Sequence, residues 1–128
     1  MGTHLMDSNA VIEFLGGVIP TSGSQWLQNL IDNEVHCLSI INRIELLSYK
    51  GTSSDMHVLT DFIDASNVLL LTEPIVLKTI EIRQQTKIKL PDAIIAATAL
   101  VHQLRLVSRN TDDFKNVSGL SIVNPHLV

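Results

Sequence analysis

Acidic side chains follow the short apolar runs of this sequence at four separate places. Asp7 comes directly after the first run, Glu45 lies one helical turn beyond the second, and Asp92 opens a long uncharged segment. Asp112 and Asp113 follow a later apolar run by a few residues. If these runs form a parallel sheet, their carboxyl ends meet at one edge, which is where open parallel sheets place their chemistry. Four segments would then deliver acids to a single site.

Several carboxylates at one sheet edge favour a hard divalent cation. Crowded anions without basic partners raise each other's pKa, and a cation removes that repulsion. Oxygen-only ligands suit Mg²⁺ or Mn²⁺. Each position also has an ordinary explanation: Asp7 as a helix cap, Glu45 as a surface residue, Asp92 as a favourable charge at a helix start, and the later pair as a turn. The joint occurrence of all four favours the metal site.

Other kinds of catalytic site find little support in the sequence. Cys37 stands alone, and no zinc-ligand spacing links the histidines, which are His4, His36, His57, His102 and His126. No glycine-rich loop precedes a Lys-Ser/Thr pair as in phosphate-binding loops, and no serine has the flanking residues of a nucleophile elbow. Because a single cysteine allows no internal disulfide, we expect a reducing, cytoplasmic location.

Length and composition indicate one globular domain over residues 1–128. The chain is 45% apolar, but no uncharged apolar run reaches the roughly 18–20 residues of a membrane helix. The N-terminus lacks the charged-then-apolar pattern of a signal peptide. With 9 basic and 13 acidic residues, the net charge of −4 does not suit a protein that holds nucleic acid mainly by neutralising phosphates. Binding to RNA or DNA would need a metal, a local patch or a partner.

Strand-like and helix-like segments alternate along the chain. We expect five short strands, one ending near Met6 and the others at 35–40, 67–72, 104–108 and 120–123. We expect helices at 8–15, 24–33, 41–50, 54–66, 73–87 and from Pro91 to about 101, with a polar turn at 109–114. The uncharged residues 93–101 predict a helix packed in the core, and 67–72 reads as a buried strand. This alternation predicts an α/β fold with a small, mostly parallel sheet.

Three stretches of the sequence resemble the successive motifs of PIN domains, in particular the VapC-type toxin ribonucleases of bacteria. They are "LMDSNAVIEFL" (5–15), "SIINRIELLSYKG" (39–51) and "LPDAIIAATALVHQLRLVSRNTDDF" (90–114). The resemblance runs over essentially the whole chain, and "PDAIIAATA" followed by "LVSRNTDDF" is its most specific part. It implies a PIN-like three-layer α/β/α fold, with helices on both sides of the sheet.

The resemblance also implies a set of metal-binding acids. Asp7, Glu45 and Asp92 stand at the first three acidic positions of the family's motifs. The fourth position falls either at Asn110 or at Asp113, and we favour Asp113. In the family's chemistry, the first and third acids bind one metal, while the second and fourth orient water or help to hold a second metal.

Polar neighbours of these acids complete the site that the resemblance implies. Ser8 and Ser108 stand where the family more often has Thr, which keeps the hydroxyl, and Asn9 belongs to the first motif. Arg109 and Asn110 border the acids and are placed to contact a substrate phosphate. An ordinary surface position is an equal alternative for Arg109.

The function that the resemblance implies is that of an Mg²⁺- or Mn²⁺-dependent endoribonuclease, the toxin of a type II toxin–antitoxin pair. We expect an antitoxin partner that covers apolar surface and places an Arg or Lys among the acids. We also expect a homodimer, for which the amphipathic segments 54–66 and 73–87 give weak independent support.

Two other functions stay open at this point. A degenerate PIN domain would only bind RNA or protein, although the acids are retained here. A receiver-like phosphoacceptor domain is also a small α/β protein with acids and Mg²⁺. It requires an Asp at the end of its third strand and a Lys at the end of its fifth, where this sequence has Thr72 and "SIVNPH".

Overall fold

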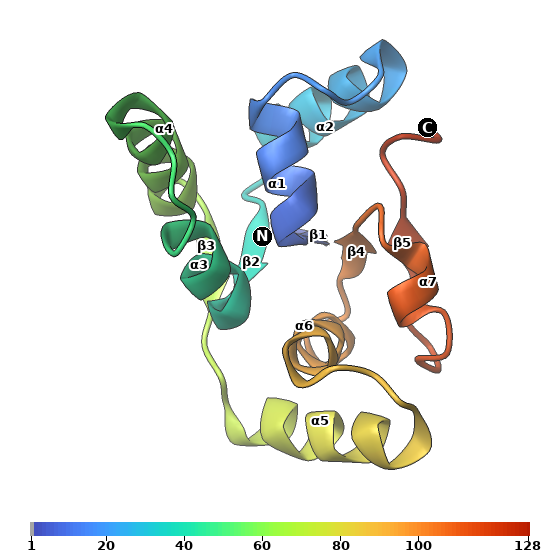
Figure 1. Cartoon of the computed structure of the whole chain (residues 1–128). Helices are drawn as coiled ribbons and strands as arrows, with labels where there is room; N and C mark the ends of the chain where they lie inside the picture. Colours follow the sequence, from blue (N-terminus) through green and yellow to red (C-terminus); the bar gives the residue numbers. More distant parts are fainter. Residues whose placement is uncertain (1) are drawn as a thin grey trace.

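A parallel sheet forms the centre of the fold. In the computed structural model, which describes residues 2–128, five strands run in the order β3-β2-β1-β4-β5 (Figure 1). Every pairing is parallel. The predicted α/β class is therefore confirmed. The strands are β1 (His4–Met6), β2 (Cys37–Ser39), β3 (Asn67–Leu69), β4 (Arg105–Val107) and β5 (Ile122–Val123).

The helices of the described chain lie where the sequence predicts them, with small changes at their ends. None of them is long and apolar enough to span a membrane. The segment 109–114, expected as a turn, contains a single helical turn. The helices are α1 (Ser8–Leu15), α2 (Thr21–Asn33), α3 (Ile40–Leu47), α4 (Ser53–Asp64), α5 (Glu73–Gln85), α6 (Leu90–Val101) and α7 (Thr111–Phe114).

Alternating strand side chains divide the core into two layers, because successive strand residues point to opposite faces of a sheet. One residue of each central strand packs toward α5 and α6: Leu5, Cys37 and Leu106. The next residue of each packs toward α1, α2 and α4: Met6, Leu38 and Val107. The sheet is thus covered on both faces, and the predicted three-layer arrangement is confirmed (Figure 1).

Helix α6 is the buried helix expected after Pro91. Ala93 and residues 95–99 are buried, and the helix packs between the sheet and α5. Pro91 lies in the first turn, where its missing N–H costs no helical hydrogen bond. Most of α6 is buried, whereas its first residues reach the surface, so Asp92 in the first turn lies at the edge of the core.

The strand expected at 67–72 is shorter and more exposed than predicted. Strand β3 ends at Leu69, and the next residues, Leu70 and Leu71, are 61% and 48% exposed. The strand lies at the edge of the sheet and pairs with β2 alone. The prediction of a buried strand was wrong, because apolar composition does not tell a central strand from an edge that leads into exposed surface.

The segment after β5 crosses the start of α2 in close contact. A Cβ atom at Gly23 would lie 1.7 Å from the carbonyl oxygen of Pro125, so only glycine fits there. The Ser22 hydroxyl donates a hydrogen bond to the backbone carbonyl of Val128. These contacts hold the last residues against the α1–α2 side of the molecule.

Candidate functional site

Asp7 is the most buried acid of the predicted site, with only 6% of its surface exposed. It is the N-cap of α1, so the capping interpretation is confirmed, and its oxygens accept several hydrogen bonds. The Ser8 backbone N–H and the Ser108 hydroxyl donate at 2.9 and 2.8 Å, and the Asn9 amide donates at 3.3 Å. Burial nevertheless raises the pKa of Asp7, and the charge of Glu45 adds to that rise.

A hydrogen-bond network connects Asp7 to Glu45 across α1 and α3. The Ser8 hydroxyl donates to Glu45 Oε1 at 2.7 Å. The Asn42 amide donates to Ser8 Oγ at 3.1 Å and, more weakly, to Asp7 Oδ1 at 3.5 Å. Through this network the exposed Glu45 is held on the same side of the sheet edge as the buried Asp7.

Asn42 is the site residue that the sequence interpretation missed. It is fully buried, and its Oδ1 accepts hydrogen bonds from the backbone N–H and the hydroxyl of Ser39 at the start of α3. The Ser39 hydroxyl in turn accepts from the Asn42 N–H, which completes a capping box. The spacing of Ser39 and Asn42 was the available signal, although it indicates only the cap and not the link to the acids.

Asp92 stands at the rim of a cavity of about 220 Å³ that Asp112 and Asp113 also line. It lies in the first turn of α6, three residues beyond the N-cap position held by Lys89, so it does not cap the helix. Burial raises the pKa of Asp92, and the charges of Asp7 and Asp113 raise it further. The structure thus brings the first, third and favoured fourth acids close enough to affect one another.

The chemistry of these donors fits a hard divalent cation. Within residues 2–128, no Lys, Arg or His nitrogen lies within 4.0 Å of the carboxylates of Asp7, Glu45, Asp92 or Asp113. Mutually repelling carboxylates of this kind are stabilised by a cation, and oxygen ligands suit Mg²⁺ or Mn²⁺. In the described part of the chain, however, no three His, Cys, Asp or Glu side chains already form a cation site. The acids are neighbours, not a preformed cage.

In the described residues, Arg109 and Asn110 have no hydrogen bond or ion pair with the four candidate acids. Arg109 Nη1 lies 2.7 Å from Glu13 Oε2, and His126 Nε2 lies 3.0 Å from the other oxygen of that carboxylate. Arg109 therefore has an ion-pair partner of its own. The Asn110 backbone N–H donates to the Ser108 hydroxyl at 3.1 Å, so Asn110 supports the group that holds Asp7. The Glu13 cluster joins three distant segments and was not predicted.

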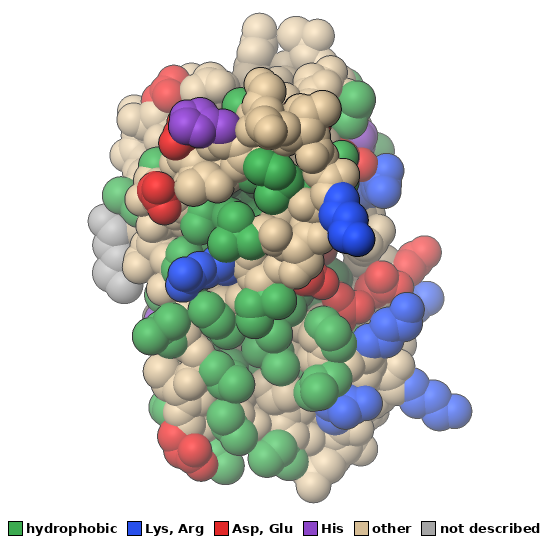
Figure 2. Space-filling model, turned by 60° about the vertical axis from the view of Figure 1, so that its left-hand side comes forward, with side chains coloured by type: hydrophobic (Ala, Val, Ile, Leu, Met, Phe, Trp, Pro, Cys, Tyr) green, Lys and Arg blue, Asp and Glu red, His purple; other side chains and the backbone are tan. Residues whose placement is uncertain are grey.

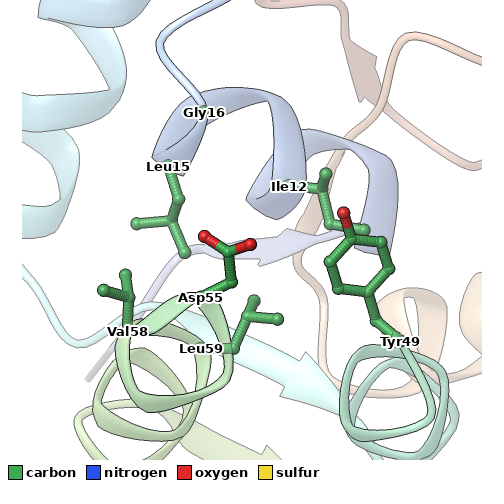
Figure 3. A pocket seen from close by; sticks show the side chains of 7 residues that line it. All are labelled: Ile12, Leu15, Gly16, Tyr49, Asp55, Val58 and Leu59. Carbon is green, nitrogen blue, oxygen red and sulfur yellow. The ribbon is translucent and has the colours of Figure 1, made fainter. Parts of the chain in front are cut away.

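A second hollow lies between α1 and α4, and none of the predicted site acids lines it (Figure 3). Its volume is about 200 Å³. Its one carboxylate, Asp55, accepts a hydrogen bond from the Thr52 backbone N–H at the start of α4. The hollow therefore suits apolar side chains better than a metal. Its lining residues are Ile12, Leu15, Gly16, Tyr49, Asp55, Val58 and Leu59.

Sequence comparison identifies the family to which this architecture belongs. Residues 5–120 match the sequence model of the PIN domain. The chain belongs to the PIN domain family. PIN domains are a family of nucleases, and they typically bind divalent metals. A search of curated protein sequences finds no match.

Chains of several solved structures have a similar fold. A chain of the toxin–antitoxin complex from Klebsiella pneumoniae is 28% identical, with a TM-score of 0.75 over 95% of this chain and 97% of that one. FitAcB from Neisseria gonorrhoeae is 26% identical, with a TM-score of 0.78 over 97% and 99%. DNA-bound VapBC from Salmonella typhimurium is 22% identical and supports the fold alone, with a TM-score of 0.82 over 98% and 99%.

The resemblance stated from the sequence motifs is thus confirmed at the level of family and fold. The receiver-like alternative is excluded, because that fold has the strand order 2-1-3-4-5 and this sheet has the order 3-2-1-4-5.

Proposed function

We propose that this PIN domain is a metal-dependent endoribonuclease and the toxin of a type II toxin–antitoxin pair. The observation that supports the proposal best is the environment of Asp7 and Asp92, which combines burial, neighbouring carboxylates and no basic partner. Both acids have raised pKa values from burial and from neighbouring carboxylates, and no basic side chain of residues 2–128 pairs with either. Carboxylates that lie close together without basic partners repel one another, and this repulsion destabilises the ionised acids unless a cation binds among them.

Each residue of the site has a distinct role in this proposal. Asp7 and Asp92 would hold the first Mg²⁺ or Mn²⁺, with Ser108 fixing the orientation of the Asp7 carboxylate. Glu45, fixed by the Ser8 hydroxyl, would accept the proton of the attacking water. Asp113 would orient that water or help to hold a second ion. The chemistry supplied by a bound divalent cation is activation of water and neutralisation of charge on the phosphate oxygens.

The proposal is tested by incubating total RNA with the protein in Mg²⁺, in Mn²⁺ and in EDTA. We expect cleavage only with metal, and products with 5′-phosphate and 3′-hydroxyl ends, because water is the nucleophile. Products with 2′,3′-cyclic phosphate ends would contradict the mechanism. RNA that is bound but left uncut in every metal would instead support a degenerate PIN domain that acts only as a binding module.

We infer that an antitoxin covers the apolar hollow of Figure 3. Ile12, Tyr49 and Val58 at this hollow are 37%, 45% and 45% exposed, which is unusual for apolar side chains that line a concave surface. A similar chain occurs in the solved toxin–antitoxin complex from Klebsiella pneumoniae. Co-expression with the protein encoded beside this gene should give a stable complex, and Val58→Glu should weaken it. Absence of any complex would count against the toxin assignment.

We also propose a homodimer formed through α5 and its surroundings. Leu77 and Ile80 on α5 are 58% and 50% exposed, and Ile44 on α3 is 56% exposed. Figure 2 shows hydrophobic side chains gathered over the lower half of one face of the molecule. Sedimentation should show a dimer at micromolar concentration, and Leu77→Glu should dissociate it. A wild-type protein that is purely monomeric under these conditions would contradict the proposal.

A further inference from the structure

The four residues that connect α5 to α6, Thr86 to Lys89, form an extended and well-supported loop. Ile88 is buried in the core, whereas Lys87 and Lys89 on either side of it are exposed. Alternate residues of an extended backbone point the same way, so burial of Ile88 directs both lysines outward on one side. Arg83 donates from Nε to the Ile88 carbonyl at 3.3 Å, which fixes the loop on α5.

Both lysines line the same cavity as the acids of the candidate metal centre. Lys87, Lys89, Asp92 and Asp113 are all among the residues that surround this space of about 220 Å³.

In the described residues, neither lysine forms an ion pair. Within residues 2–128, neither the Lys87 nor the Lys89 ammonium lies within 4.0 Å of a carboxylate oxygen, although carboxylates line the same cavity. Lys78, the preceding lysine on α5, does have such a partner, because its Nζ lies 3.2 Å from Glu81 Oε2. In the part of the chain that the structure describes, both loop lysines are therefore free to bind an anion.

We propose that Lys87 and Lys89 bind consecutive backbone phosphates of single-stranded RNA beside the metal centre. This inference rests on the proposed ribonuclease function and adds the element that holds the substrate strand. Two residues of extended chain span roughly 7 Å, which is comparable with the separation of neighbouring phosphates. A pair of ammonium groups on a supported loop supplies local attraction that the net charge of −4 cannot supply. The strand would run from the acids along the α5–α6 loop.

RNA binding by the full chain tests this inference without depending on cleavage. Fluorescence anisotropy with a labelled single-stranded RNA would be measured in EDTA over a range of salt concentrations, for the wild type, Lys87→Ala, Lys89→Ala and the double variant. Each lost phosphate contact lowers the slope of log K against log salt by about 0.7 for a single strand. Over the decade from 1 M to 0.1 M salt, that corresponds to about fivefold weaker binding per lysine at 0.1 M.

The matched controls are Lys87→Arg, which keeps the charge, and Lys50→Ala, which removes an exposed lysine outside this cavity. Both should keep the wild-type slope. A smaller slope of log K against log salt in Lys87→Ala and Lys89→Ala, but not in the controls, supports the inference. Unchanged slopes in those variants, with RNA still cleaved in Mg²⁺, would overturn the phosphate site and leave the ribonuclease proposal standing. A wild type that neither binds nor cleaves RNA would overturn both.

Discussion

Replacing Asp92 by Asn tests whether this residue is a metal ligand or an ordinary acid at a helix start. The change keeps the size of the side chain and removes one charge from the neighbourhood of Asp7 and Asp113, both of which raise the pKa of Asp92. Asp92 does not occupy the N-cap position, so the only local loss is its interaction with the helix dipole, about 0.3–1 kcal/mol. Relief of the repulsion offsets that loss, and without metal the free energy of unfolding should change by less than about 1 kcal/mol.

The effect of metal should be much larger. A ligand at 100 times its Kd stabilises the folded state by about 2.7 kcal/mol. For 128 residues the unfolding entropy is about 0.27 kcal/mol/K, so each kcal/mol raises the Tm by about 4 °C. The wild type should therefore gain about 10 °C at such a metal concentration. If Asp92→Asn weakens binding at least tenfold, its gain should be at most about 5 °C.

The assay is a set of thermal melts in EDTA and in increasing Mg²⁺ or Mn²⁺. The matched control is Asp112→Asn, which removes an exposed acid that lines the same cavity but has no place in the proposed ligand set. We expect the control to keep the full gain in Tm. If Asp92→Asn and the wild type gain equally, or if neither gains anything, the assignment of Asp92 as a metal ligand is wrong.

Three further changes test the environment of the site and the fold that supports it. Ser108→Ala removes a hydrogen bond to the buried Asp7 carboxylate. The pKa of Asp7 should rise further, and urea unfolding should show a loss of about 1.5–3 kcal/mol at pH 7 that shrinks as the pH falls toward the raised pKa of Asp7 and the acid takes up a proton. Burial lowers the pKa of His4 and His36 below 6.5, so on acidification the unfolded chain binds protons at these histidines before the folded chain does. The free energy of unfolding should therefore fall as the pH drops from 6.5 toward 5. A flat profile over this range would contradict this prediction. Gly23→Ala should cost about 1–3 kcal/mol by forcing the C-terminal segment off α2, and unchanged urea midpoints would show that the contact is not tight.

The parts of the fold that could be predicted are those set by local patterns. The uncharged residues after Pro91 could be buried only as a core helix, and α6 is one. The short apolar runs ending near Met6 and at 104–108 are predicted as strands because helix patterns separate them, and they form β1 and β4. The run at 67–72 has a similar composition but forms an edge strand, since its place in the sheet depends on pairing that no local pattern records.

In the candidate site, too, some features could be predicted from the sequence and others could not. Asp7 lies at the carboxyl edge of the sheet because it directly follows β1, and Asp92 lies on that side because α6 runs from there back to the start of β4. The contact of Asn42 with Ser8 and the shared partners of Glu13 could not be predicted, because each joins segments far apart in the sequence. Arg109 is an example: its sequence position left a phosphate contact and a surface position equally open, and its ion pair with Glu13 of α1 was not predicted.

We propose that acids from separate segments bind one divalent cation at the carboxyl edge of the sheet. Crystals soaked in Mn²⁺ and measured for anomalous scattering test it most directly. We predict a strong anomalous peak within about 2.1 Å of carboxylate oxygens of Asp7 and Asp92, with Glu45 and Asp113 nearby, and its loss in crystals of Asp92→Asn. Manganese bound elsewhere, or no peak between Asp7 and Asp92 at millimolar Mn²⁺, would contradict the account.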